Sequence, residues 1–123
     1  MSGDSGWVPI GSDEVAVLRA VVAGSRVRRW QPLVDNLTNA RVQRDPGEWI
    51  LDIETTCDTI DAPDGVLPVR TFVTGPDGMF HGEILVWIGA GRVTGLEYAW
   101  VTESAPTNWP APEQLVVTPP PGL

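Results

Sequence analysis

Apolar and polar residues follow a helical pattern in the first part of the chain. Between residues 13 and 23, apolar side chains recur every three or four positions, at Val15, Leu18, Val21 and Val22. This spacing predicts one helix, for which Ser12 is the expected N-cap and Gly24 the expected end. A second, short helix is predicted from Pro32 to Leu37, because proline suits a first helical turn.

From residue 40 onward the pattern is typical of strands. We expect strands over residues 40–43, 48–54, 66–74, 79–88 and 92–101. In the second strand, Trp49, Leu51 and Ile53 alternate with acidic residues, which predicts one buried face and one face in water. Residues 75–78, Gly-Pro-Asp-Gly, have the composition of a tight turn between the third and fourth strands.

The last two strands form the clearest predicted hairpin. A two-residue loop at Ala90-Gly91 would pair Trp87 with Thr94. In this register Trp87, Tyr98 and Trp100 share one face of the sheet. The opposite face carries Phe80, Ile84, Val86 and Ile88. A register shift of one residue would exchange the two faces.

Together these elements predict one α+β domain spanning residues 1–123. One or two N-terminal helices pack on an antiparallel meander sheet of about four strands. Residues 1–11 are expected to be a flexible start. Residues 102–123 hold six of the twelve prolines, so we expect a proline-rich tail packed on the domain that builds neither a sheet nor a long helix, with one helical turn at most near residues 111–117. If the helices cover the Ile84 face, the tail or another protein must cover the Trp87 face.

The charge balance restricts the partners. The 123 residues include 16 acidic and 8 basic side chains, a net charge of -8. This argues against nucleic acids and anionic membranes, which are bound by clustered Lys and Arg, and leaves a basic protein as a partner. Cys57 is the single cysteine, and the sequence shows neither a signal peptide nor an apolar run of about 20 residues. We therefore expect a soluble cytoplasmic protein, as a monomer or a homodimer.

Candidate catalytic and metal motifs fail on spacing or context. Gly89-Ala90-Gly91 joins two strands, whereas a dinucleotide-binding glycine loop joins a strand to a helix. His81-Gly82-Glu83 lacks the P-C-x-x-C partner of a zinc deaminase site. The spacing of Asp58, Asp61 and Asp64 does not match a calcium loop. We expect no cofactor, no metal site, no catalytic residues and no enzymatic activity.

One alternative stays open. His81 is the single histidine, so Cys57 with His81 is the sole conceivable catalytic dyad. The alternative function is a small-ligand-binding protein or an enzyme with a pocket near these two residues.

Surface character gives the first functional hypothesis. Seven acidic residues lie close together in the chain: Asp45, Glu48, Asp52, Glu54, Asp58, Asp61 and Asp64. Such a segment can steer a basic partner, and exposed aromatic residues beside charges are typical of binding hot spots. The predicted partner-binding residues are Asp52, Glu54, Asp58, Asp61, Asp64, Trp87, Tyr98 and Trp100. Solubility and protection of an edge strand are the simpler explanation for the acidic segment.

Three stretches carry a resemblance: residues 82–88, residues 91–100 and residues 108–115. The chain resembles a group of small actinobacterial proteins, without an established activity, that end in a GxLxxLE-aromatic hairpin and a P-x-P-x-x-L tail. Members often carry a Cys-Gly-Cys element where this chain has residues 44–47. The resemblance implies an α+β fold. By analogy with small acidic immunity proteins, we predict a non-catalytic interaction protein that binds a basic partner through the acidic segment and the aromatic face.

Overall fold

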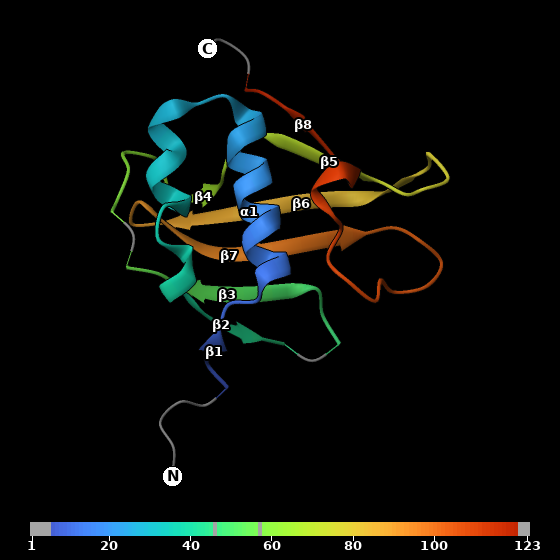
Figure 1. Cartoon of the computed structure of the whole chain (residues 1–123), viewed down its shortest axis with the longest axis horizontal. Coiled ribbons are helices and arrows are strands. Elements are labelled where there is room, and N and C mark those ends of the chain that lie inside the picture. The colour runs from blue at the N-terminus through green and yellow to red at the C-terminus, as the bar shows by residue number, and fades with distance from the viewer. Residues whose placement is uncertain (1–5, 46, 57, 121–123) are drawn as a thin grey trace.

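An α-helix lies across one face of an antiparallel sheet in the computed structural model, which describes residues 6–45, 47–56 and 58–120 (Figure 1). The sheet has eight strands in the order β1-β2-β3-β7-β6-β5-β8, and β4 pairs with β6 beside that path. The predicted α+β class with an antiparallel sheet is therefore confirmed. The expected count of about four strands is too low, because short strands at both edges extend the sheet.

The helix α1 spans Ser12–Ser25, and three short 3₁₀-helices span Arg28–Val34, Leu37–Asn39 and Pro112–Gln114. The N-cap is Gly11 and not the predicted Ser12. The backbone N–H of Gly11 donates a hydrogen bond of 2.8 Å to the carboxylate of Glu14, which thus caps the helix from inside its first turn.

Gly24 lies inside α1 and does not end it, contrary to prediction. The helix ends at Ser25 and is capped by Arg26, which has a left-handed backbone with φ of 61°. A side chain at Gly24 would place its Cβ 2.6 Å from Cβ of Val117, so glycine is required here for close packing against β8.

The strands are β1 Val8–Pro9, β2 Arg41–Arg44, β3 Ile50–Glu54, β4 Gly65–Val66, β5 Arg70–Thr74, β6 Phe80–Gly89, β7 Arg92–Trp100 and β8 Leu115–Thr118. The predicted strand over residues 66–74 is interrupted between β4 and β5 at Pro68, which has no N–H for a ladder. The predicted turn at residues 75–78 is present, with Gly78 N–H bonded to Gly75 C=O at 2.9 Å.

The tail does build part of the sheet, which corrects the prediction that its prolines would prevent this. Residues 115–118 contain no proline, and as β8 they pair with β5 from Arg70↔Thr118 to Val73↔Leu115. The predicted helical turn is limited to Pro112–Gln114 just before this strand. Prolines flank β8 instead of interrupting it.

The register of the β6–β7 hairpin differs from the predicted one beyond its first two pairs. Ile88 pairs with Val93, as predicted, but Trp87 pairs with Gly95. The partner jumps over Thr94, which is the extra residue of a β-bulge. Every later pair is shifted by one residue, so Tyr98 lies opposite Ile84.

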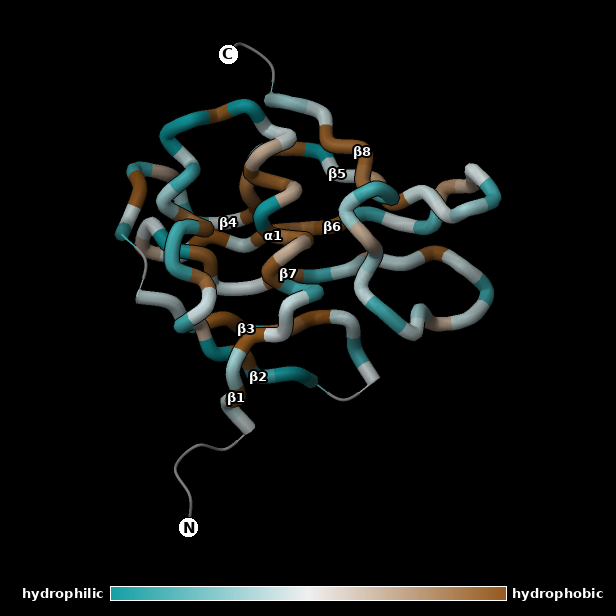
Figure 2. Tube along the Cα trace, in the orientation of Figure 1, coloured by the Kyte–Doolittle hydropathy of each residue, from teal (hydrophilic) through white to brown (hydrophobic). Residues whose placement is uncertain are grey.

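The core fills the space between α1 and the sheet. Its buried members include Val17, Leu18 and Val21 of α1 and Leu51, Ile84 and Leu96 of the sheet. Apolar stretches are concentrated along α1 and the central strands, and polar stretches lie in the peripheral loops (Figure 2). Phe80, predicted on this buried face, is exposed instead, because the pairing of β5 with β6 also shifts at this end of the strand.

Candidate functional site

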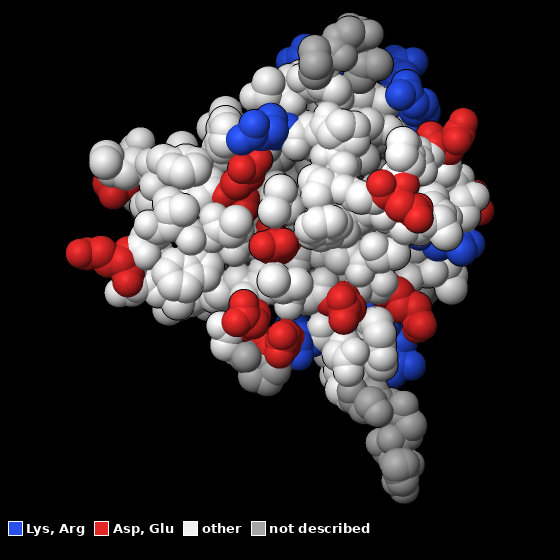
Figure 3. Space-filling view, turned by 180° about the vertical axis from the view of Figure 1, so that it is seen from behind, with Lys and Arg blue, Asp and Glu red and all other residues white. Residues whose placement is uncertain are grey.

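The face of the sheet opposite α1 combines apolar and acidic side chains. Leu51 and Ile53 point into the core, so the residues that alternate with them point away from α1. We define the open face by six residues: Ile50, Asp52 and Glu54 of β3, Leu85 and Trp87 of β6, and Glu97 of β7. Ile50 and Trp87 are 41% and 39% exposed, and Asp52 and Glu54 are exposed. In Figure 3, which views the molecule from this side, acidic side chains are scattered around a broad uncharged area.

Trp87 is held in one orientation on the open face. Its side chain packs over the opposite residue Gly95, where an added Cβ would lie 3.4 Å from Cβ of Trp87. Its indole N–H donates a hydrogen bond of 3.3 Å to the carboxylate of Glu97. The geometry presents one edge of an indole ring beside a negative charge, which suits an apolar and cationic partner group.

The predicted aromatic set is not on one face, and the bulge at Thr94 is the cause. Tyr98 lies on the α1 side of the sheet, is 6% exposed, and contacts the rings of Trp49 and Trp109 at 6.1 and 6.4 Å between centroids. Burial raises the pKa of the Tyr98 phenol above 10.0. Trp100, the last residue of β7, lies on the same side of the sheet as Tyr98 and is 37% exposed. Of the three aromatic residues, only Trp87 belongs to the open face.

The predicted acidic residues are all exposed, but they do not form one cluster. Asp52 and Glu54 lie on the open face, whereas Asp58, Asp61 and Asp64 lie in the loop between β3 and β4. The Asp64 carboxylate accepts a hydrogen bond of 3.0 Å from the N–H of Ala90. The same loop is joined to the β6–β7 turn by a bond of 2.9 Å from Ile60 N–H to Gly91 C=O. Asp64 therefore has a structural role in this loop.

The β5 side of the sheet is balanced in charge. Arg70 and Glu83 form an ion pair at 2.7 Å, and the Arg70 guanidinium lies 5.1 Å from the centroid of the Phe72 ring. On β2, exposed Arg41 lies opposite Glu54 on this face, so the excess negative charge near Trp87 is found at Asp52 and Glu97.

A buried carboxylate network was missed by the sequence reasoning. Glu14 is 2% exposed, forms an ion pair of 2.7 Å with Arg44, and accepts a hydrogen bond of 3.2 Å from the Trp109 indole N–H. The network joins α1, β2 and the tail. Glu14 has the pattern of an ordinary acidic residue in a first helical turn, and nothing in its spacing identifies the two distant partners.

The alternative dyad is not tested by the described residues. Cys57 lies outside them. His81 lies near the β5–β6 turn, where its Nε2 is 3.5 Å from the Asp77 carboxylate. Within residues 6–45, 47–56 and 58–120, no group of three His, Cys, Asp or Glu side chains is placed to hold a metal ion.

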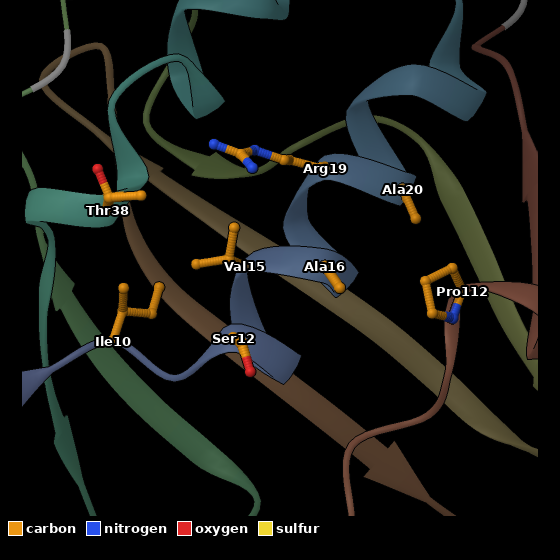
Figure 4. Close-up of a pocket in the computed structure, with 8 residues that line it drawn as sticks. All are labelled: Ile10, Ser12, Val15, Ala16, Arg19, Ala20, Thr38 and Pro112. Carbon is orange, nitrogen blue, oxygen red and sulfur yellow. The ribbon is translucent and has the colours of Figure 1, made fainter.

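Another depression lies on the other side of the molecule, along α1. It has a volume of about 740 Å³ and is open to solvent, with Ile10, Val15 and Ala16 in its wall. Figure 4 shows Arg19 reaching from α1 toward Thr38 across this depression. His81 does not line it.

Comparisons with known proteins assign neither a family nor a function to the chain. No family model matches the chain, and neither a curated protein nor a solved structure matches it. Among the described residues, no helix is both long and apolar enough to cross a membrane. The site therefore has to be interpreted from its geometry and charge alone.

Proposed function

We propose that the protein is a non-catalytic interaction module that binds a basic protein through the open face, in the manner of a small acidic immunity protein. The observation that carries this proposal is the exposed indole of Trp87 beside acidic side chains on the open face. Tryptophan is enriched in binding hot spots, and a half-exposed, oriented ring loses little conformational entropy when a partner covers it.

Charge supports a basic partner. The net charge of -8 favours association with a cationic surface, and the carboxylates of Asp52 and Glu97 lie beside Trp87 on the open face. Complementary charge raises association rates and makes them sensitive to salt. Apolar contact at Trp87 and Ile50 would supply the part of the affinity that salt does not screen.

The test is affinity capture from a lysate of the source cells, with the native protein and with the double variant Asp52→Asn/Glu54→Gln as bait. We expect the native protein to recover a basic protein that elutes as salt rises, and the variant to recover much less of it. The matched control is Glu103→Gln/Glu113→Gln, which removes the same charge from exposed positions outside the open face.

Two results would contradict the proposal. In one, the open-face variant and the control recover the same protein equally well. In the other, light scattering shows that the free protein is a stable homodimer and that a variant without the Trp87 side chain is a monomer. The open face would then be occupied by a second copy of this chain.

A further inference from the structure

A groove lies at the corner of the molecule where the tail crosses the start of β3. It has a volume of about 490 Å³, and the side chains of Trp49, Leu51 and Trp109 give it an apolar wall. The two indole rings meet edge to face, with 5.1 Å between their centroids. We call this depression the Trp49 groove.

The indole wall is fixed by polar contacts to Glu14 and Arg44, which line the groove as well. The N–H of Trp109 is bonded to Glu14, and the Glu14 charge is matched by the guanidinium of Arg44 at 2.7 Å. Trp49 is held between Tyr98 and Trp109, and its carbonyl accepts the Tyr98 N–H at 2.8 Å. A ligand in the groove would therefore contact rings that are already ordered, so that binding would cost little side-chain conformational entropy.

The groove carries a net negative charge, because its lining includes four acidic side chains and one basic side chain, that of Arg44, which is paired with Glu14. Asp13, Asp45 and Glu48 line the rim of the groove and are exposed. In the part of the chain that the structure describes, their carboxylates have neither an ion-pair nor a hydrogen-bond partner. An apolar groove with aromatic walls and a carboxylate rim is complementary to a cation with a flat apolar surface.

We propose that the Trp49 groove binds an arginine side chain of the basic partner, an inference that rests on the function proposed above. A guanidinium stacks on an indole face and forms paired hydrogen bonds with a carboxylate, whereas the ammonium of lysine is compact and strongly hydrated. The groove opens on the α1 side of the sheet, but Glu48 and Trp49 directly precede Ile50 of the open face, so a partner that reaches around the start of β3 would contact both surfaces.

The test uses the blocked peptide acetyl-Gly-Arg-Gly-amide and the same peptide with neutral citrulline in place of arginine. Binding is followed by nuclear magnetic resonance at the indole N–H signals, assigned with single Trp→Phe variants. We expect the arginine peptide to shift the signals of Trp49 and Trp109 in a saturable way and the citrulline peptide to bind at least fivefold more weakly. A lysine peptide should fall between them.

Two charge-neutralising variants test whether the rim carboxylates of the Trp49 groove bind the arginine peptide. Asp45→Asn/Glu48→Gln removes two rim charges and should weaken binding of the arginine peptide about five- to tenfold, the size expected for two exposed ion pairs. Asp58→Asn/Asp61→Asn removes the same charge from another exposed loop and should change the affinity less than twofold. All four side chains are exposed, so both variants should keep the native fold.

Three results would overturn the inference: equal binding of the arginine and citrulline peptides, no saturable shift of either indole signal, or equal losses in the two variants. None of them bears on the open face, which is tested separately through Asp52, Glu54 and Trp87. If the open-face variants lose the partner while the groove variant keeps it, the proposed function stands and the groove inference fails. If the open-face variants and the groove variant all keep the partner, both proposals fail.

Discussion

At the scale of single residues, buried polar groups show how the tail is attached. Glu14 accepts bonds from Arg44, from Trp109 and from the Gly11 backbone, so one carboxylate holds the helix start, β2 and the tail together. Tyr98 lies beside the same tail residue, Trp109. Both side chains can therefore be used to report on the packing of the tail.

Replacing Glu14 by Gln should lower the free energy of unfolding by about 1–2 kcal/mol, because the charged acceptor of several hydrogen bonds is lost while the half-exposed Arg44 can still be hydrated. Urea unfolding followed by circular dichroism measures this. The control Asp13→Asn changes the exposed neighbour in the same helical turn and should cost less. Equal losses in the two variants would show that the buried network contributes nothing.

Tyr98 is the single tyrosine, so absorbance reports its ionisation alone. Burial raises its pKa in the folded protein above the ordinary value of 10.0. The phenol therefore contributes stability that is fully present below pH 10 and is lost as pH rises through the higher folded pKa. We expect a spectrophotometric titration midpoint above 10 for the folded protein, and a smaller alkaline loss of stability in Tyr98→Phe. A midpoint at or below 10 would contradict the burial of this side chain.

At the scale of elements, periodicity predicted those parts of the fold that local patterns control. The helix, the β6–β7 hairpin with its Ala90-Gly91 turn, and the alternation in β3 follow from the pattern of the residues that form them. The bulge at Thr94 could not be predicted, because the apolar pattern of β7 is compatible with pairing to β6 both with and without one extra residue. This single residue separates Tyr98 from Trp87.

The roles of glycine and proline were also ambiguous from sequence. A glycine near the end of a helical pattern predicts a helix end, but Gly24 is required by contact with Val117 of a strand distant in sequence. Likewise, a proline count over residues 102–123 does not show that a proline-free run of four residues can pair with β5. Of the predicted site residues, Asp52, Glu54 and Trp87 lie on the open face, whereas Tyr98 and Trp100 were wrongly placed beside Trp87, and its actual neighbour Glu97 was not predicted.

The sign of the stability change in Gly24→Ala tests the packing of α1 on β8. On an open helix surface this change stabilises by about 1 kcal/mol. Here the added methyl group would collide with Val117, so we expect a loss of about 1–3 kcal/mol in the free energy of unfolding. The neighbouring Ala23→Gly, at an exposed position, serves as the control for helix propensity alone. Stabilisation by Gly24→Ala would contradict the close contact.

At the scale of the whole molecule, the two sides of the sheet differ in the residues that they carry. The side that carries α1 holds the core, and the open face presents Trp87, Ile50 and three carboxylates to solvent (Figures 1 and 3). An antiparallel sheet tolerates one face in water, so this arrangement is stable without a partner. The same arrangement leaves the open face, with its exposed Trp87 beside Asp52 and Glu97, accessible to solvent.

The measurement that tests this account most directly is the equilibrium Kd of the complex with the captured basic partner, compared between Trp87→Ser and Met79→Ser. Both changes remove a large exposed apolar side chain, but Met79 lies in the β5–β6 turn outside the open face. We expect Trp87→Ser to weaken binding by about 2 kcal/mol, or about thirtyfold, and Met79→Ser to change it less than twofold. Equal affinities of the two variants would contradict the assignment of the open face as the binding surface.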